Sequence, residues 1–367
     1  LLTLHMTIDQ LLQFAVENQA SDLHLQTGSP PRLRIVGQVR EIESPPLKDD
    51  QLRQFIRAIG PRAVVDDINA AMQRGYDFAY AMPGVGRFRC NLYSHLGLPG
   101  LVVRLILPKI RSLAELHLPP LLAELAEARR GIVLMSGATG SGKSTTLAAL
   151  VDLLNSNYHL KILTIEDPVE YEHTSKKSLV SHVEVGRDTP SFDHGLRQAV
   201  RQAPDVILVG ELRDAETVQM ALRAADTGHQ ILATIHASNA PQTIERLLAM
   251  VPPEALPIAR QQLAAALVGI VSQRLTVGTD GRHRPVVELL RGDSVTAKYI
   301  MENRISDLAD YIATRERGMQ TFDQHLSRLY QSGEVSGVQA LAVATNPEAL
   351  ALEIRMPHTV VHERPRP

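Results

Sequence analysis

The sequence is poor in cysteine, tryptophan and net charge, and each shortage excludes a class of protein. Its 367 residues include one cysteine and no tryptophan, and the formal net charge is −2. A single cysteine, Cys90, excludes an intramolecular disulfide and a zinc site built from several cysteines, which suits a reducing cytosol. We expect Cys90 to be a small buried hydrophobic residue. Because no basic excess is available to hold a phosphate backbone, we expect no nucleic-acid partner.

Long apolar runs are also missing. The longest uncharged apolar stretch, 263–271, is far short of the roughly 18 residues that a membrane-spanning helix needs. No basic segment followed by an apolar leader opens the sequence. We therefore expect a cytoplasmic protein that reaches a membrane only through a partner. A hydrophobic content of 44% is enough for the cores of several ordinary domains.

The N-terminal part has the pattern of a small α+β domain. A phrase that reads like a natural start begins at Met6, and apolar residues then recur at helical spacing over 8–18. Short alternating segments separated by proline and glycine predict strands at 22–25, 32–36, 77–80, 87–93 and 101–107. Residues 6–107 are therefore predicted to form one domain, and the proline-bearing stretch 108–120 is predicted to be a linker.

The middle of the chain changes to continuous apolar runs that alternate with helical patterns. The runs are 131–135, 161–165, 205–209 and 230–235. This pattern is typical of a parallel sheet covered by helices on both faces, so an α/β core is predicted over 121–291. Helical patterns then predict a helical C-terminal portion over 292–356, and the polar tail 357–367 is predicted to be disordered.

A glycine-rich loop carries the strongest chemical signal. It follows the apolar run GIVLM, precedes a helical run, and comprises Gly137, Ala138, Thr139, Gly140, Ser141, Gly142, Lys143, Ser144 and Thr145. Backbone N–H groups of such a loop surround a β-phosphate, and the following helix adds the positive end of its dipole. Lys143 is expected to reach the β- and γ-phosphate oxygens, and Ser144 to offer its hydroxyl to Mg²⁺. The loop therefore predicts ATP and Mg²⁺ as cofactors.

Phosphoryl transfer also needs a carboxylate near the γ-phosphate, and the segment DVILVGE offers two. Asp205 opens the predicted strand, and Glu211 follows it. Six residues at ~3.3 Å each separate them by roughly 20 Å, so only one of them reaches the nucleotide. Because phosphates bind at the carboxyl ends of parallel strands, we select Glu211 to orient the attacking water and to hold Mg²⁺ through water.

Further candidates follow two other strands. Glu166 and Asp167 end the run KILTI, and either carboxylate is suited to polarising water or to the outer shell of Mg²⁺, with helix capping as the alternative. His229 and His236 flank the run QILATI, and each is a candidate sensor of the γ-phosphate, with a core or surface histidine as the alternative. Their odd separation argues against a shared metal site on one strand face.

Five segments together resemble the secretion ATPase superfamily and, within it, the PilT/PilU-type pilus-retraction ATPases. The resemblance covers most of residues 7–335. The segments are ASDLHL at 20–25, GATGSGKSTT at 137–146, TIEDPVEY at 164–171, DVILVGELRD at 205–214 and TGHQILATIHA at 227–237. The resemblance implies a PAS-like N-terminal domain, a RecA-like ATPase core with a helical C-terminal portion, and a homohexameric ring with nucleotide between the two domains.

The resemblance also implies a mechanism. The family uses arginines of the N-terminal domain against the γ-phosphate, and Arg89 in GRFRCN and Arg104 in LVVRLIL match its pattern. ATP would draw both arginines onto the nucleotide, and hydrolysis would release them in sequence around the ring. The ring would act through an inner-membrane platform protein, so that pilin subunits leave the base of the type IV pilus. The expected location is therefore cytoplasmic, at the inner membrane through the pilus machine.

Departures from the pattern leave the type of motor open. The retraction-associated stretch AIRNLIRE is replaced by TAKYIMEN at 296–303, and Ala203 stands where many relatives carry an acid. With GMQTFDQHL at 318–326, these features lean toward the accessory, PilU-type motors, which would add a paralogous ATPase as partner. The extension and type II secretion ATPases usually carry a four-cysteine zinc insert, which a single cysteine argues against.

Two other classes of function compete with pilus retraction. A ring ATPase that translocates nucleic acid would use the same loop, but the neutral charge balance disfavours it. A regulator that binds ATP without turnover is the second alternative, and Glu211 argues for turnover.

Overall fold

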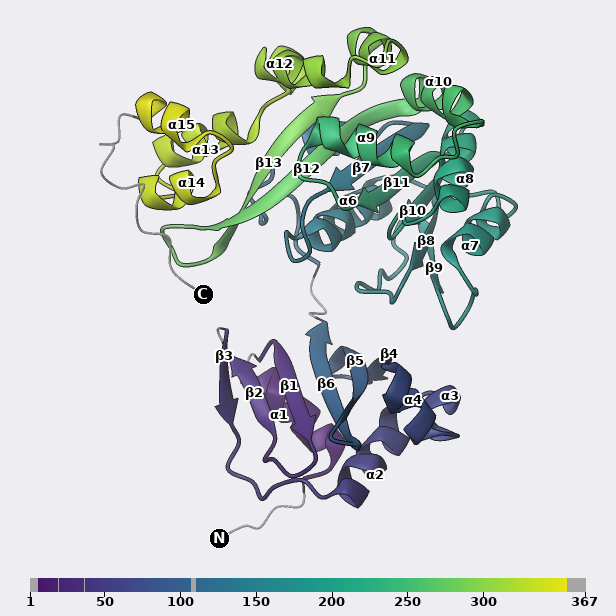
Figure 1. The fold of residues 1–367 in the computed structure, drawn as a ribbon, viewed down its shortest axis with the longest axis vertical. Helices are drawn as coiled ribbons and strands as arrows, with labels where there is room; N and C mark the ends of the chain where they lie inside the picture. The colour runs from purple at the N-terminus through teal and green to yellow at the C-terminus, as the bar shows by residue number, and fades with distance from the viewer. Residues whose placement is uncertain (1–5, 19, 36, 107–109, 355–367) are drawn as a thin grey trace. The chain divides into compact units, whose positions relative to one another are not determined.

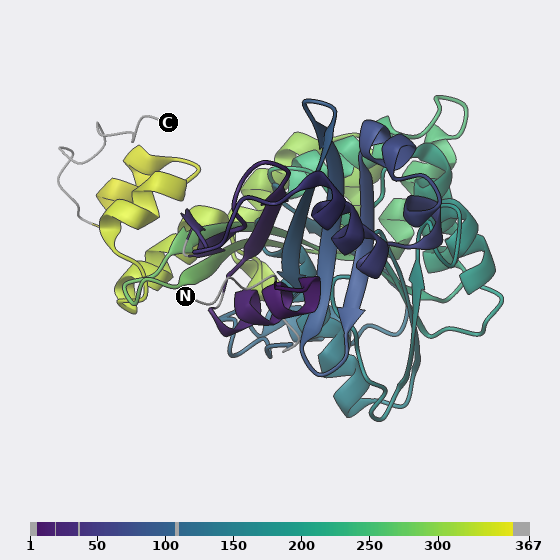
Figure 2. The same cartoon turned by 90° about the horizontal axis from the view of Figure 1, so that it is seen from below.

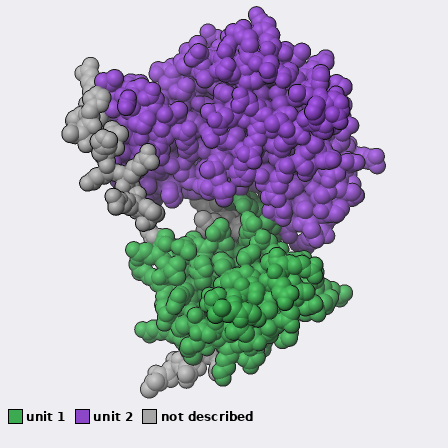
Figure 3. All heavy atoms as spheres, viewed as in Figure 1, with its two compact units in different colours: residues 1–109, 168–172 green, residues 110–167, 173–367 purple. Residues whose placement is uncertain are grey.

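The chain folds into two compact units, which Figure 3 colours separately. The computed structural model describes residues 6–18, 20–35, 37–106 and 110–354. Unit 1 contains Leu1–Lys109 with Pro168–Glu172, and unit 2 contains Ile110–Asp167 with His173–Pro367. The predicted tail 357–367 lies outside the described residues. None of the described helices is both long and apolar enough to cross a membrane.

Unit 1 contains a six-stranded antiparallel sheet in the order β3-β2-β1-β6-β5-β4 (Figure 1). Its strands are β1 Asp22–Gln26, β2 Arg32–Ile35, β3 Gln38–Glu41, β4 Tyr76–Met82, β5 Gly86–His95 and β6 Leu98–Ile106. Its helices are α1 Ile8–Glu17, α2 Asp49–Ile59, α3 Arg62–Val65 and α4 Ile68–Arg74. The predicted helix and all five predicted strands are present, although positions 36 and 107 lie outside the described residues. The pattern missed β3 and α2–α4.

Local sequence explains the boundaries and the core of unit 1. Thr7 caps α1, because its hydroxyl accepts a hydrogen bond from the backbone N–H of Gln10 and the Gln10 side chain accepts one from Thr7. In β5, Phe88, Cys90 and Leu92 alternate with more exposed residues and are buried in the core of the unit. Cys90 is fully buried, as predicted, and burial raises the pKa of its thiol.

Unit 2 contains a seven-stranded sheet in the order β13-β12-β7-β11-β10-β8-β9. Every pairing is parallel except that of β12 with β13. The strands are β7 Gly131–Ser136, β8 Lys161–Glu166, β9 Leu179–Glu184, β10 Val206–Val209, β11 Gln230–Ile235, β12 Leu267–Val277 and β13 His283–Arg291. The four predicted runs form the centre of this sheet, whereas β9, β12 and β13 were missed.

Helices cover both faces of the sheet, as the continuous apolar runs predict. In β7, Ile132 and Leu134 face one core cluster, while Val133 and Met135 face the other. The first cluster includes residues of α7 Phe192–Ala199, α8 Ala215–Asp226, α9 Ala240–Ala249 and α10 Leu256–Ala266. The second includes residues of α5 Leu121–Ala126 and α6 Lys143–Asn157. The chain is therefore a mixed α/β structure with two sheets.

Helices complete the chain after β13, and no strand occurs within 292–354. They are α11 Ser294–Met301, α12 Leu308–Ala313, α13 Phe322–Gln331, α14 Gly337–Val343 and α15 Pro347–Glu353. The last three share a small core with Val286 of β13, beside the hairpin of β12 and β13 (Figure 2).

The stretch predicted to be a linker, 108–120, contributes to the core of unit 2. Leu113, Leu116 and Leu118 are buried and pack in the cluster that contains α5 and α6. Burial of three leucines contributes several kcal/mol, at ~1.5–3 kcal/mol each, so this stretch is anchored from Leu113 onward. Residues 107–109 lie outside the described part of the chain.

Candidate nucleotide site

The glycine-rich loop connects β7 to α6 in a shape that requires glycine. Gly137, Gly140 and Gly142 adopt φ values of 147°, 80° and 88°. A Cβ atom on Gly137 would lie 2.4 Å from the carbonyl oxygen of Gln273, and one on Gly142 would lie 2.7 Å from Nε2 of the same residue. The backbone therefore curls tightly against β12, with α6 beginning directly after it at Lys143.

The loop has the donors that a phosphate group needs. Nζ of Lys143 is buried and donates hydrogen bonds of 2.9 Å to the carbonyl oxygens of Gly137 and Ala138. Oγ of Ser141 is buried and has no hydrogen-bond partner among the described residues. The first N–H groups of α6 open onto the same loop. An ammonium group, an orphaned hydroxyl and a helix N-terminus fit a nucleotide phosphate.

Gln273 of β12 holds the loop and is a site residue that the sequence pattern did not predict. Its side chain is buried. Nε2 donates a hydrogen bond of 2.7 Å to the carbonyl oxygen of Ser141, and Oε1 accepts one of 2.8 Å from Oγ1 of Thr146. Beside it, the hydroxyl groups of Ser136 and Ser272 are hydrogen-bonded at 2.8 Å. The signal in the sequence was a polar stretch, Ser272 to Arg274, that follows the apolar run at 267–271.

Glu211 lies at the carboxyl edge of the sheet, as the strand argument predicts. It follows β10, and the backbone N–H of Gly210 donates 2.7 Å to the carbonyl oxygen of Ile165 in β8. Oε1 of Glu211 lies 3.2 Å from Nε2 of His236, and Oε2 accepts 2.6 Å from Nε of Arg213. The carboxylate is therefore held from both sides. Its side chain is 19% exposed, which leaves it open to water.

Arg213 connects the acids that follow two strands. Its Nη1 lies 3.4 Å from Oδ2 of Asp167, and its guanidinium packs over the ring of Phe192. Glu166 is the last residue of β8, level with Gly210, so both members of the acidic pair lie at the same edge as Glu211. Asp205 lies at the opposite edge, where its carboxylate accepts 2.7 Å from the backbone N–H of Lys161.

The two histidines lie at opposite ends of β11. His236 follows the strand, level with Gly137 of the loop, because Ile235 pairs with Ser136. His229 precedes the strand at the amino edge, where its Nδ1 contacts the carbonyl oxygen of Ala224 at 3.1 Å. The structure therefore brings His236, and not His229, to the glycine-rich loop of its own chain.

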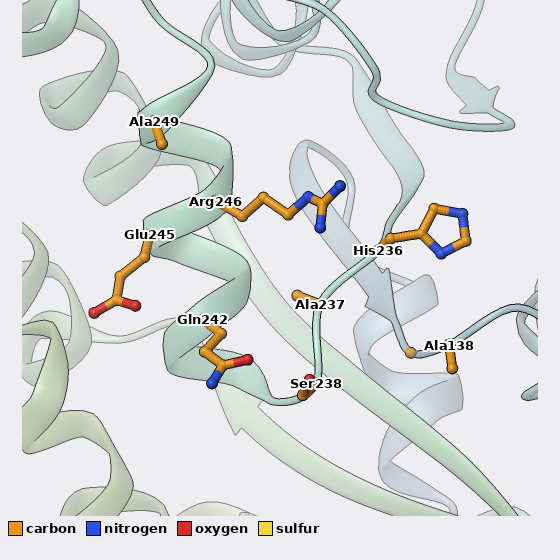
Figure 4. A pocket seen from close by; sticks show the side chains of 9 residues that line it. Ala138, His236, Ala237, Ser238, Gln242, Glu245, Arg246 and Ala249 are labelled. Atoms are coloured by element: carbon orange, nitrogen blue, oxygen red, sulfur yellow. The ribbon is translucent and has the colours of Figure 1, made fainter.

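A hollow of about 550 Å³ opens beside the loop (Figure 4). Its lining includes Gly137, Ala138 and His236 together with Gln242 and Arg246 of α9. Figure 4 shows the Arg246 side chain extending from α9 toward the segment that follows β11. Among the described residues, no group of three or more His, Cys, Asp and Glu side chains is placed to hold a metal ion.

The two predicted arginines lie in unit 1, directly opposite one another on β5 and β6. Nε of Arg104 donates 2.8 Å to Oδ1 of Asp22, which is buried, and Arg89 lies 3.9 Å from Asp77. Two like charges on paired strands repel, and these carboxylates offset that repulsion. Asp22 belongs to the segment ASDLHL, so one role of that segment is to hold Arg104, a role that its sequence alone did not predict.

Comparison with known proteins identifies the family of this chain. A family model described as type II/IV secretion system protein matches residues 2–284. The Pseudomonas aeruginosa type IV pilus retractation ATPase PilT is 40% identical over 344 residues, which are 94% of this chain and 99% of that protein. The type IV pilus ATPase PilU of the same organism is 38% identical over 96% of this chain and 92% of its own length.

Solved structures show the same fold. The crystal structure of the pilus retraction motor PilT with bound ADP has a TM-score of 0.86 at 35% identity, covering 94% of this chain and 99% of that one. The structure of the Legionella pneumophila ATPase DotB has a TM-score of 0.77 at 27% identity, and the match covers 92% of this chain and 96% of that one. With its glycine-rich loop and Glu211 at one edge of a parallel sheet, the chain belongs to the family of type II/IV secretion system proteins.

Proposed function

We propose that this chain is the subunit of an ATP-hydrolysing motor that drives retraction of a type IV pilus. The observation that carries the proposal is the position of Glu211. It lies at the same sheet edge as the glycine-rich loop and is held by His236 and Arg213. The similarity to PilT and PilU, which extends over nearly the whole chain, supports a role in retraction.

The residues of the loop divide the work of binding. Lys143 exchanges its two carbonyl contacts for β- and γ-phosphate oxygens, and the curled backbone and α6 donate N–H groups. Ser144 would hold Mg²⁺, with Glu211 acting on it through water. When bound, Mg²⁺ neutralises charge on the phosphate oxygens. ATP and Mg²⁺ are therefore the proposed cofactors, and the residues of the loop from Gly137 to Thr145 are their binding site.

Glu211 orients the attacking water and accepts its proton. Arg213 and His236 fix the position of the carboxylate, because each contacts a different oxygen. Arg213 also connects it to Asp167, and Glu166 lies at the same edge, suited to the outer shell of the magnesium ion. The nucleotide-binding edge therefore combines acids from two neighbouring strands.

The finer parts of the proposal rest on the family. They are a PAS-like unit 1, a RecA-like core in unit 2, a homohexameric ring, and Arg89 and Arg104 acting on the γ-phosphate. A γ-phosphate sensor role for His229 is still a prediction. Its position at the amino edge of the sheet, away from the glycine-rich loop of its own chain, gives that role no support. The partners would be an inner-membrane platform protein and, through it, pilin. The location would be cytoplasmic, at the inner membrane through the pilus machine.

Deletion of the gene tests the proposal. Loss of twitching with an excess of surface pili supports retraction, whereas cells without pili would point to an extension motor and contradict it. Nearly equal identities of 40% to PilT and 38% to PilU keep the accessory, PilU-type motor as a second candidate. An accessory motor would leave retraction in the deletion strain to the paralogous ATPase.

A further inference from the structure

Three arginines from separate elements line a second hollow in unit 2. Arg291 ends β13, Arg317 lies in the turn before α13, and Arg328 lies on α13. The hollow has a volume of about 650 Å³, and none of its lining residues belongs to the glycine-rich loop or contacts Glu211. We call it the arginine hollow. Pro119, Pro120 and Leu121 form its apolar side, and Glu124 is its single carboxylate.

The backbone of the arginine-bearing turn is strained. Arg315 and Arg317 adopt φ values of 63° and 50°, and Gly318 follows at 81°. The left-handed region is unfavourable for a residue other than glycine, and such strain concentrates at ligand-binding and switch regions. Here the strained backbone carries the Arg317 side chain that lines the hollow.

Two of the three arginines have carboxylate partners. Arg291 lies 3.0 Å from Glu124, an ordinary ion pair at the rim. Arg317 lies 3.9 Å from Asp293, whose carboxylate already accepts hydrogen bonds from two backbone N–H groups and from the hydroxyl of Tyr311. The charge of Arg317 is therefore only weakly compensated.

Arg328 is the least compensated of the three. Among the described residues, neither a hydrogen bond nor an ion pair reaches its guanidinium. Desolvation, and after it the positive charge of Arg315, lowers the pKa of Arg328. The neighbouring Arg315 lies 3.9 Å from Glu353, a long and exposed pair. Among the described residues, the hollow thus has one guanidinium without an anionic partner, that of Arg328, and a second, that of Arg317, whose carboxylate partner lies 3.9 Å away.

We propose that the arginine hollow binds a small phosphate-bearing ligand, with Arg317 and Arg328 contacting its phosphate group. A guanidinium offers paired N–H donors that match the oxygens of a phosphate. The volume falls in the range of about 300–1,000 Å³ that is usual for small-molecule sites. The apolar side suits an organic group attached to the phosphate, whereas an inorganic phosphate would use the arginines alone.

Calorimetric titration of the full-length protein tests the proposal. Saturating ADP first fills the glycine-rich loop, and pyrophosphate is then added as the probe. We expect one further binding event that weakens as salt rises. It should weaken at least tenfold in Arg317→Ala/Arg328→Ala. The matched control, Arg40→Ala/Arg57→Ala, removes two exposed arginines from unit 1 and should leave binding within twofold of wild type.

A further variant and further probes distinguish the possible results of this titration. Arg317→Gly/Arg328→Ala removes the same charges while relieving backbone strain, so it guards against misfolding, and its basal ATPase rate should equal that of wild type. Tighter binding of a phosphate monoester with an apolar group than of pyrophosphate would identify an organic ligand. The proposal is overturned if ADP-saturated wild type shows no binding, or if the arginine variants bind pyrophosphate as wild type does. Tighter binding of a polyglutamate peptide than of either phosphate probe would overturn it in favour of an acidic protein partner.

Discussion

Oε1 of Glu211 lies 3.2 Å from Nε2 of His236, and these residues follow adjacent parallel strands. The contact joins the proposed catalytic carboxylate to the strand that lies beside the glycine-rich loop. Because β11 pairs with both β7 and β10, it positions His236 between the loop and Glu211. The sheet order therefore determines which side chains meet at the nucleotide.

Replacing Gln273 by leucine should loosen the glycine-rich loop. The change removes the hydrogen bonds to Ser141 and Thr146 and leaves the buried hydroxyl of Thr146 without its partner. We expect a loss of about 1–3 kcal/mol in stability. ADP binding, measured by calorimetry, should also weaken. Gln261→Leu, at an exposed position on α10, serves as the control, and equal ADP affinity in both variants would rule out this role for Gln273.

The sequence was sufficient to predict that the glycine-rich loop and Glu211 lie at the same edge of the sheet. Glycine spacing, the preceding apolar strand and the following helix are local features, so the loop and Glu211 were both predicted. Gln273 is far from the loop in sequence and reaches it only because β12 pairs with β7. The pairing of β12 with β7 joins segments far apart in sequence, so no local sequence pattern predicts it.

The missed strands have a similar explanation. β12 and β13 contain polar residues such as Ser272, Gln273 and Glu288 that are buried by contacts with distant segments. Glu288, for example, accepts a hydrogen bond from the backbone N–H of Ala240 at the start of α9. These buried polar residues therefore interrupt the apolar pattern from which β12 and β13 could have been predicted as strands. Likewise, the leucines at 113–118 read as a linker because their burial depends on the core of unit 2.

Replacing Asp22 by asparagine should destabilise unit 1 by about 2 kcal/mol at neutral pH, because a charged hydrogen bond to Arg104 is lost. Desolvation opposes ionisation, but hydrogen bonds from Arg104 and Ser21 outweigh it and lower the pKa of Asp22. The advantage of wild type is thus present above the ordinary carboxyl pKa and disappears as pH falls through the lowered pKa of Asp22. Hydrogen exchange of the β1 amides at pH 7 and at pH 2 measures the difference in stability between wild type and Asp22→Asn.

Asp50→Asn is the control for Asp22, since Asp50 is exposed at the start of α2. Its effect should stay within about 0.5 kcal/mol. A gap between wild type and Asp22→Asn that is just as large at pH 2 as at pH 7 would show that ionisation of Asp22 is not the cause.

Burial of His325 should make unit 2 less stable in mild acid. Desolvation, aided by the charge of Arg328, lowers the pKa of His325 from 6.5 to about 4, while its Nδ1 accepts a hydrogen bond from the backbone N–H of Val287. Between these two pKa values His325 is protonated in the unfolded chain but neutral in the folded chain. Stability therefore falls as pH drops from 6.5 to about 4. The loss from this residue is on the order of 3 kcal/mol.

His325→Gln keeps an acceptor for Val287 and cannot titrate. Urea unfolding at several pH values should show a shallower acid dependence than in wild type. Burial also lowers the pKa of His173 to about 4, so part of the slope should remain. An unchanged slope in the variant would mean that His325 is already protonated in the folded protein.

Phosphate release by Glu211→Gln measures the central claim most directly. Glutamine keeps the size of the side chain but cannot accept the proton of the attacking water, so we expect hydrolysis to fall by about 10²–10⁴-fold. ADP affinity should stay close to that of wild type, because the loop and Lys143 are untouched. As a control, Glu245→Gln should hydrolyse ATP normally, because Glu245 is an exposed residue of α9 at the hollow beside the glycine-rich loop and does not contact Glu211. Hydrolysis by Glu211→Gln at the wild-type rate would contradict the account.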